Sequence, residues 1–297
     1  MALSCRAMKL GIIGGSGLYA MPGLLGAERR AQETPWGWPS DALLEGELAG
    51  LPVAYLPRHG RGHRIGPGEI NYRANIAALK IRGCTAVVSV AACGSFRDDL
   101  PPGSLFIPDQ IVDRTMRREK SFFGEGLIAH VSLAEPVATD MAKRVAAAAA
   151  AIDVPFRADG TYLAIEGPHF ATRAESRLAR TQGMDVVGMT AMPEAALARE
   201  AEMAYAIAAM VTDFDAWKQE VVTTASVLEV MAANVANAQR LVAALAAGLA
   251  AKPLPIPSAQ GWERALDDAI VTPRSEWPVA KAAQLRAIAP RLFEATR

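Results

Sequence analysis

The feature that most constrains the fold of this chain is a regular alternation of strand-like and helix-like segments. Thr85–Ala92 is a β-branched, nearly continuous apolar run, the pattern of a strand buried on both faces of a sheet. Asn71–Lys80, before it, has helical spacing and a stop signal at Gly83, and Met141–Ile152 and Ala225–Leu249 are also helical in character. Further strand-like segments are Lys9–Gly14, Val53–Leu56, Thr161–Ile165, Asp185–Met189 and Tyr205–Thr212. This alternation predicts an α/β fold in which helices surround a mixed β-sheet.

The length of the chain favours one large domain. Its 297 residues, 51% of them hydrophobic, are enough to bury a large core. We expect one domain over residues 1–252, followed by a helical extension over residues 253–297 that begins at the joint Pro253–Ser258. Helices are expected there over Trp262–Ile270 and Val279–Ile288. The extension would pack on the same domain or on a neighbouring subunit.

The charge balance argues for a small-molecule partner. Lysine and arginine number 31, as do aspartate and glutamate, so no net field attracts nucleic acid or an acidic membrane face. The most apolar stretch, Leu241–Ala251, is far shorter than the roughly 20 residues that cross a bilayer, and no signal-peptide pattern follows Met1–Leu10. Cys5, Cys84 and Cys93 are odd in number and lack metal-site or disulfide spacing. We therefore expect a cytoplasmic protein.

A glycine-rich turn follows the first predicted strand. Its pattern Gly15-x-Gly17-x-x-Ala20 is similar to a dinucleotide-binding fingerprint, which must open a helix, but Pro22 interrupts the turn that would follow. A plain tight turn is an equal alternative. Backbone N–H groups of such a turn can also converge on a phosphate, and Ser16 would add a hydroxyl.

Arg58 and His59 stand at the exit of the second predicted strand. The planar guanidinium of arginine suits a phosphate oxyanion. His59 and His63 are four residues apart, but they could share a metal only on a helix, which the surrounding glycines disfavour, so no metal is expected. Arg61 and Arg64 are interpreted as surface charges.

The sequence Asp213-Phe214-Asp215 follows the buried strand that ends near Thr212. Open α/β sheets bind ligands at the carboxyl ends of strands, and residues two apart in an extended chain point the same way. Two crowded carboxylates raise the proton affinity of one of them, which would supply a general acid near neutral pH. A capped turn or a solvated edge remains the alternative for such a pair.

Taken in order, these segments resemble the 5′-methylthioadenosine phosphorylase branch of the purine nucleoside phosphorylase family. The matching segments are Gly11–Leu18, Arg58–Gly60, Asn71–Asn75, Ala92–Ser95, Pro108–Gln110, Asp113–Thr115, Glu166–Pro168, Arg173–Ser176, Met189–Thr190, Pro193–Ala195 and Thr212–Trp217. The resemblance implies a single nucleoside phosphorylase-like domain that splits S-methyl-5′-thioadenosine into adenine and 5-methylthio-ribose 1-phosphate, in purine and methionine salvage. Inorganic phosphate would be a co-substrate, no cofactor would be needed, and the enzyme would be a homotrimer.

The resemblance also implies where phosphate, ribose and base lie. The implied phosphate site consists of Ser16, Arg58, His59, Ala91, Ala92 and Thr190. Ala91 departs from the family pattern, which often has a hydroxyl there, and the loss of one neutral hydrogen bond costs about 0.5–1.5 kcal/mol. Met189 would lie against the ribose and Phe170 on the purine.

The two aspartates have separate implied roles in holding the base. Asp213 would hydrogen-bond or protonate N7 of the departing purine, and Asp215 would accept from its 6-amino group. A 6-oxopurine would place its O6, a hydrogen-bond acceptor, against the Asp215 carboxylate, which is also an acceptor. Adenine, whose 6-amino group donates, is therefore favoured. Ala171, where the branch commonly has a serine, leaves a 6-oxopurine nucleoside or methylthioinosine phosphorylase as the alternative.

The 5′ end of the substrate would lie in an apolar pocket. The expected residues are Thr224, Val227 and Leu228, and His130 is expected to reach in from a neighbouring subunit. Three rivals remain for the whole chain: a hydrolytic nucleosidase, a nicotinamide-dependent oxidoreductase and a non-catalytic nucleoside-binding protein.

Overall fold

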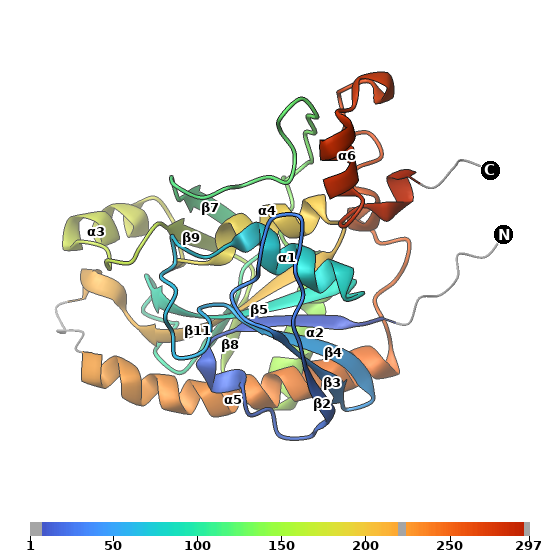
Figure 1. Ribbon diagram of the computed structural model, residues 1–297. Coiled ribbons are helices and arrows are strands. Elements are labelled where there is room, and N and C mark those ends of the chain that lie inside the picture. The colour runs from blue at the N-terminus through green and yellow to red at the C-terminus, as the bar shows by residue number, and fades with distance from the viewer. Residues whose placement is uncertain (1–7, 219–223, 294–297) are drawn as a thin grey trace.

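The structure is a computed structural model that describes residues 8–218 and 224–293. The protein is built around a twisted mixed β-sheet (Figure 1). Within the described residues the sheet has 11 strands, ordered β2-β3-β4-β1-β5-β10-β9-β7, with β11 pairing with β5 and β6, and β8 with β6. The strands are β1 (Leu10–Gly14), β2 (Leu24–Arg30), β3 (Leu43–Leu48), β4 (Leu51–Pro57), β5 (Ala86–Ser95), β6 (Leu105–Ile107), β7 (Gln110–Arg114), β8 (Phe156–Ala158), β9 (Thr161–Ile165), β10 (Val186–Gly188) and β11 (Ala204–Asp213). The α/β fold with a mixed sheet is confirmed.

Helices cover both faces of the sheet, as predicted. They are α1 (Tyr72–Ile81), α2 (Thr139–Ala151), α3 (Arg173–Thr181), α4 (Ala191–Glu200), α5 (Thr224–Ala251) and α6 (Val279–Leu285). Figure 1 shows α1 and α4 on one side of the sheet and α2 and α5 on the other. Strand β11 explains this layering, since alternate side chains point to opposite faces: Tyr205 and Ile207 pack with α1 and α4, and Ala206 and Met210 pack with α2 and α5.

The centre of the sheet is parallel, so several strands end at the same edge. Strand β1 pairs in parallel with β4 and β5, and β5 pairs in parallel with β11. Strand β5 extends to Ser95, beyond the predicted end at Ala92, because its last residues pair with β10. A register shift between Val211 and Asp213 places Asp213 opposite Gly94.

The C-terminal segment packs against the same hydrophobic cores. Leu254 and Trp262 join the cluster around α5, and Leu266 and Ile288 join the cluster around α4. The boundary at residue 252 stays a prediction. The prediction of a helix over Trp262–Ile270 is wrong.

Residues 262–271 differ from the predicted helix at both ends. It shortens to a 3-10 turn over Trp262–Arg264, and Ile270 and Val271 pair instead with the backbone of residues 128–129. The expected helix at Val279 forms, although it ends at Leu285.

None of the helices in the described part of the chain combines the length and hydropathy needed to cross a bilayer. Cys84 and Cys93 are buried free thiols, and Cys5 lies outside the described residues.

Candidate active site

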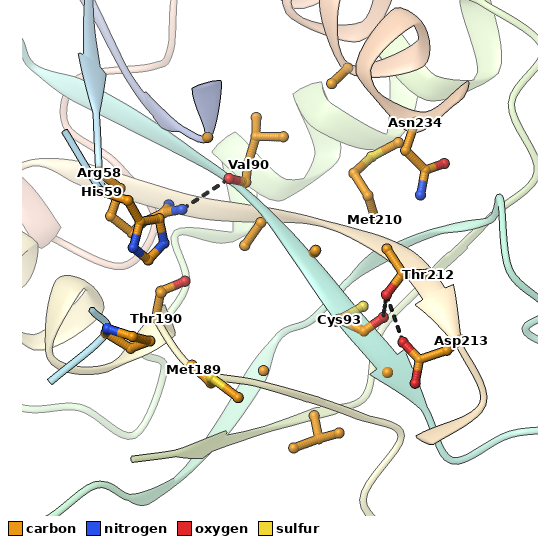
Figure 2. Close-up of a pocket in the computed structure, with 18 of the residues that line it drawn as sticks. Arg58, His59, Val90, Cys93, Met189, Thr190, Met210, Thr212, Asp213 and Asn234 are labelled. Carbon is orange, nitrogen blue, oxygen red and sulfur yellow. Dashed lines mark hydrogen bonds between the residues drawn. The ribbon is translucent and has the colours of Figure 1, made fainter. Parts of the chain in front are cut away.

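A cavity of about 360 Å³ opens at the carboxyl ends of β1, β4, β5 and β11. This is the edge at which open α/β sheets bind ligands. The predicted residues that line it are Arg58, His59, Ala91, Ala92, Phe170, Ala171, Met189, Thr190, Asp213 and Asp215. Figure 2 shows Arg58, His59 and Thr190 at one end of the cavity and Asp213 at the other. The structure therefore brings the predicted phosphate and base residues into one cavity, although their roles stay predictions.

Arg58 follows β4 and is almost completely buried, with 2% of its surface exposed. Its Nε donates to Glu194 Oε1 at 2.6 Å, and its Nη1 donates to the carbonyl of Val90 at 3.1 Å. Burial acts to lower the pKa of Arg58, but the charge and hydrogen bond of Glu194 outweigh it and raise that pKa above its ordinary value. The guanidinium therefore stays charged, and its charge is balanced inside the protein.

Glu194, from the first turn of α4, is the centre of this buried network. Its Oε2 accepts from the hydroxyls of Ser89, at 2.7 Å, and Tyr205, at 3.0 Å, and Ser89 in turn accepts from Arg58 at 2.7 Å. Each buried polar group thus has a partner, which a buried ion pair needs if it is to be tolerated. Glu194 was not predicted as a functional residue, although an acid on an otherwise apolar stretch of helix was the available signal.

His59 is held as a neutral imidazole. Its Nδ1 lies 2.8 Å from the carbonyl oxygen of Ile65, which can only accept, so Nδ1 carries the proton. Burial, together with the positive charge of Arg58, lowers the pKa of His59 to about 4. The ring stacks on that of His63, with centroids 4.2 Å apart. His63 lines the cavity as well, a position that the sequence analysis did not assign to it.

Thr190, which precedes α4, has a hydroxyl ready for a ligand. Its side chain is buried and its Oγ1 has no hydrogen-bond partner within the described residues. A buried hydroxyl without a partner is costly, and a bound oxyanion would satisfy it. The turn at Gly15 lies at the same end of the cavity, but the side chain of Ser16 lies outside what the structure describes.

The two aspartates lie at the opposite end of the cavity, at the end of β11. Asp213 Oδ1 accepts from the hydroxyl of Thr212 at 2.7 Å, and Oδ2 accepts from the backbone N–H of Asp215 at 2.8 Å. Gly94 of β5 lies directly beneath. A Cβ at that position would come within 3.3 Å of Asp213 Oδ2 and 3.1 Å of Asp215 Cβ, so glycine leaves room for both carboxylates.

Asp215 is the more buried carboxylate, with 5% of its surface exposed and a backbone φ of +53°. Burial raises the pKa of Asp215, the hydroxyl of Ser176 partly offsets this by donating to Oδ2, and the negative charge of Asp213 adds to the rise. Crowding was expected to raise the proton affinity of one aspartate. The pKa of Asp215 is indeed raised, but chiefly because the group is desolvated.

The turn that carries Asp215 is clamped by Trp217. The indole Nε1 donates to the carbonyl of Ser95 at 2.7 Å, and the guanidinium of Arg180 lies 3.9 Å from the centre of the ring. Arg180 also donates to the carbonyl of Phe96 at 3.0 Å. These contacts attach the aspartate turn to the end of β5.

The remaining wall of the cavity is formed by Met189, Phe170 and Ala171. Phe170 is 75% exposed, so it stands at the mouth. The buried side chain of Arg118 fixes the Met189 segment, because its Nη1 donates to the carbonyl of Met189 at 2.6 Å and its Nη2 donates to that of Glu166 at 2.7 Å. Sequence reasoning missed Arg118, since nothing local distinguishes it from the neighbouring surface arginines.

Besides Ser16, four predicted residues are not placed in the cavity. His130 is exposed, its backbone N–H donates to the carbonyl of Ala269 at 2.8 Å, and it does not line the cavity of its own chain. Thr224, Val227 and Leu228 lie in the first turns of α5, but their side chains lie outside what the structure describes.

The structure disfavours a nicotinamide cofactor at the glycine turn. The turn opens only a 3-10 turn over Ser16–Leu18 before β2 begins at Leu24, whereas a dinucleotide fingerprint must open an α-helix. Across the described residues, no group of three or more histidine, cysteine or acidic side chains is arranged to hold a metal ion.

Comparisons with known proteins agree with this geometry. The model of the Phosphorylase superfamily matches residues 9–247. S-methyl-5′-thioadenosine phosphorylase of Rhodospirillum rubrum is 50% identical over 99% of this chain and 100% of its own, and the protein of that name from Bradyrhizobium diazoefficiens is 51% identical over 89% and 90%.

Two solved structures have the same fold. A methylthioadenosine phosphorylase from an Antarctic soil metagenomic library superposes with a TM-score of 0.90 at 43% identity, over 95% of this chain and 99% of its own. Methylthioadenosine phosphorylase from Schistosoma mansoni in complex with adenine gives a TM-score of 0.78 at 33% identity, over 95% and 98%. From the matched residues and these relatives together, we conclude that the chain belongs to the phosphorylase superfamily.

Proposed function

We propose that this protein is a pentosyltransferase that cleaves S-methyl-5′-thioadenosine with inorganic phosphate, giving adenine and 5-methylthio-ribose 1-phosphate. The observation that carries the proposal is the cavity with two unlike ends: donors at Thr190 and the glycine turn, and two carboxylates at the end of β11. The relatives named above carry the same activity in their names, and one of them binds adenine.

The two ends would act on opposite faces of the ribose. Phosphate, held by Thr190 and by backbone N–H groups of Ala91 and Ala92, would approach the anomeric carbon as the purine departs. Holding both reactants in line converts a bimolecular step into an intramolecular one. Charge would develop on the base and on the ribosyl group, and preset groups would stabilise it.

Asp213 would stabilise the leaving purine by a hydrogen bond or proton transfer at N7. Because Asp213 Oδ1 and Oδ2 are each held by a donor, the carboxylate cannot rotate freely, and its orientation is set before substrate arrives. Asp215 would accept from the 6-amino group. Met189 would lie on the ribose and Phe170 over the purine, where its exposure at the mouth leaves a face to cover a ligand.

The same proposal covers the features that the sequence resemblance implied. The enzyme would need no metal and no organic cofactor, and would act in the cytoplasm, in purine and methionine salvage. It would form a homotrimer in which His130 lines the site of a neighbouring subunit, which suits its exposure on its own chain. Thr224, Val227 and Leu228 would surround the methylthio group.

The test is an assay with S-methyl-5′-thioadenosine in the presence and absence of inorganic phosphate. We expect adenine release that depends on phosphate, one sugar 1-phosphate formed for each adenine, and no loss of activity with a chelator. Equal release without phosphate would make the protein a hydrolase. A preference for methylthioinosine or inosine would assign it to 6-oxopurine nucleosides, and binding without turnover would make it a binding protein.

A further inference from the structure

Ser176 lies beneath the base end of the cavity and has no assigned role. It belongs to the first turn of α3, whose start is fixed by a capping box in which Thr172 accepts from the N–H of Glu175 and the Glu175 carboxylate accepts from the N–H of Thr172. The side chain of Ser176 lies on the inner side of this turn, where it is completely buried. Its hydroxyl donates to Asp215 Oδ2.

This hydroxyl is important because the charged groups that act on Asp215 are acidic. Asp213 on β11 and Glu175 on α3 both disfavour an ionised Asp215, and burial disfavours it further. Ser176 and the backbone N–H of Ala216 act in the opposite direction, since a donor stabilises the ionised carboxylate. Ser176 is the side-chain donor of the pair, and it binds Oδ2.

We propose that Ser176 is a specificity-determining positioning residue: by donating to Asp215 Oδ2 it keeps that carboxylate an ionised acceptor, which selects 6-aminopurines and rejects 6-oxopurines. The inference rests on the proposed function, in which Asp215 faces the 6-substituent of the base. An ionised carboxylate can accept from an amino group but repels a carbonyl oxygen.

The loss of this hydroxyl has a specific chemical consequence. Without its donor, Asp215 takes up a proton more readily, and a neutral carboxyl group can donate to the O6 of a 6-oxopurine. Ser176→Ala should therefore lower activity on 6-aminopurines and raise activity on 6-oxopurines. A merely structural defect would lower both alike.

The experiment measures kcat/KM for methylthioadenosine and for methylthioinosine from pH 5.5 to 8.5 in the wild type, Ser176→Ala and Ser176→Cys. Asp213 addresses N7 of both substrates, so its contribution cancels in the ratio of the two values. At pH 7 we expect the amino-to-oxo ratio to fall about 10-fold or more in Ser176→Ala, the size expected for one hydrogen bond to a charged group. The pH at which the ratio declines should also move upward. The Cys variant, a weaker donor of similar shape, should lie between the two.

Ser258→Ala is the matched control. Ser258 also donates its hydroxyl to a carboxylate, that of Glu263, but it lies in the C-terminal segment and does not line the cavity. Its ratio should equal that of the wild type.

An unchanged ratio in folded Ser176→Ala, or an equal fall for both substrates, would overturn the inference. If the Ala variant does not fold, the Cys variant decides by the same criterion. Calorimetric titration with free adenine and hypoxanthine repeats the comparison without turnover. If the wild type does not cleave methylthioadenosine, the proposed function is contradicted. If Ser176→Ala binds adenine and hypoxanthine with the same preference as the wild type, the role of Ser176 is contradicted.

Discussion

The two ends of the cavity treat charge in opposite ways. At the end proposed for phosphate, called the phosphate end, Arg58 is buried and neutralised by Glu194 at 2.6 Å, and His59 is neutral. At the end proposed for the base, called the base end, Asp213 and Asp215 stand close together, held by hydroxyl and backbone donors. One end therefore presents balanced charge and preset dipoles, and the other presents carboxylates that no cation among residues 8–218 and 224–293 neutralises in an ion pair.

This difference indicates what each end can do. An end whose charges are already balanced can bind an anion and release it, because its donors are oriented but its net field is small. An end with crowded, partly desolvated carboxylates is suited to hold or move a proton as charge develops on the base. Removing a charge at one end should therefore have different consequences from removing a charge at the other end.

The largest effect is expected from Asp213→Asn. The amide keeps the size of the side chain but cannot take or give the proton, so kcat should fall on the order of 10²–10⁴-fold, the range for general acid catalysis. Steady-state kinetics with methylthioadenosine measure it. Asp268→Asn, at an exposed aspartate of the C-terminal segment, is the control and should be neutral. Full activity in Asp213→Asn would remove the assigned role.

Glu194→Gln should affect stability more than chemistry. It leaves the Arg58 charge buried without its partner, which costs about 3–5 kcal/mol of unfolding free energy. Urea unfolding measures this loss. Glu28→Gln, which breaks the exposed pair with Arg30, should cost less than about 1 kcal/mol. If the two variants unfold at the same urea concentration, charge at the phosphate end is not balanced as described.

The neutral His59 predicts a pH dependence of stability. Its folded-state pKa, about 4, lies below the ordinary 6.5, so between these values the unfolded chain binds a proton that the folded chain does not. This contribution is fully present above pH 6.5 and is lost as pH falls through 4, by an amount on the order of 3 kcal/mol. Unfolding from pH 4.5 to 7 should show a smaller slope in His59→Gln. The exposed His169→Gln should keep the slope of the wild type, and an identical slope in His59→Gln would contradict a neutral His59.

The smallest effect is expected at the Thr190 hydroxyl. Thr190→Val preserves shape but removes the donor, so KM for phosphate should rise about 2- to 10-fold, equivalent to one neutral hydrogen bond. KM for the nucleoside should hardly change and the unfolding free energy should not fall, since the hydroxyl has no hydrogen-bond partner in the part of the chain that the structure describes. Thr190→Ser should restore the affinity for phosphate. An unchanged phosphate KM in Thr190→Val would place the anion elsewhere.

Local patterns were sufficient to predict the main architecture, whereas the grouping of the site residues was implied by the family resemblance. The buried run before Cys93 and the acidic pair after Thr212 identify strands whose ends meet, because parallel strands finish at one edge. The hairpin of β2 and β3 was missed because its strands are partly exposed and carry charged residues, so they lack an apolar run.

Long-range pairings were not predictable from the sequence. Glu194 meets Arg58 across 136 residues, and Ser176 meets Asp215 across 39, so neither contact has a local signal. The positive φ of Asp215 also has no signal in the sequence. These tertiary contacts decide the charge state of the predicted site residues.

The most direct test of the account is a crystal structure with methylthioadenosine and sulfate bound together. We predict the purine edge against Asp213 and Asp215, and the anion within hydrogen-bond distance of the Thr190 hydroxyl, with the ribose between them beside Met189. A base bound away from the aspartates, or an anion in a separate cavity, would contradict it.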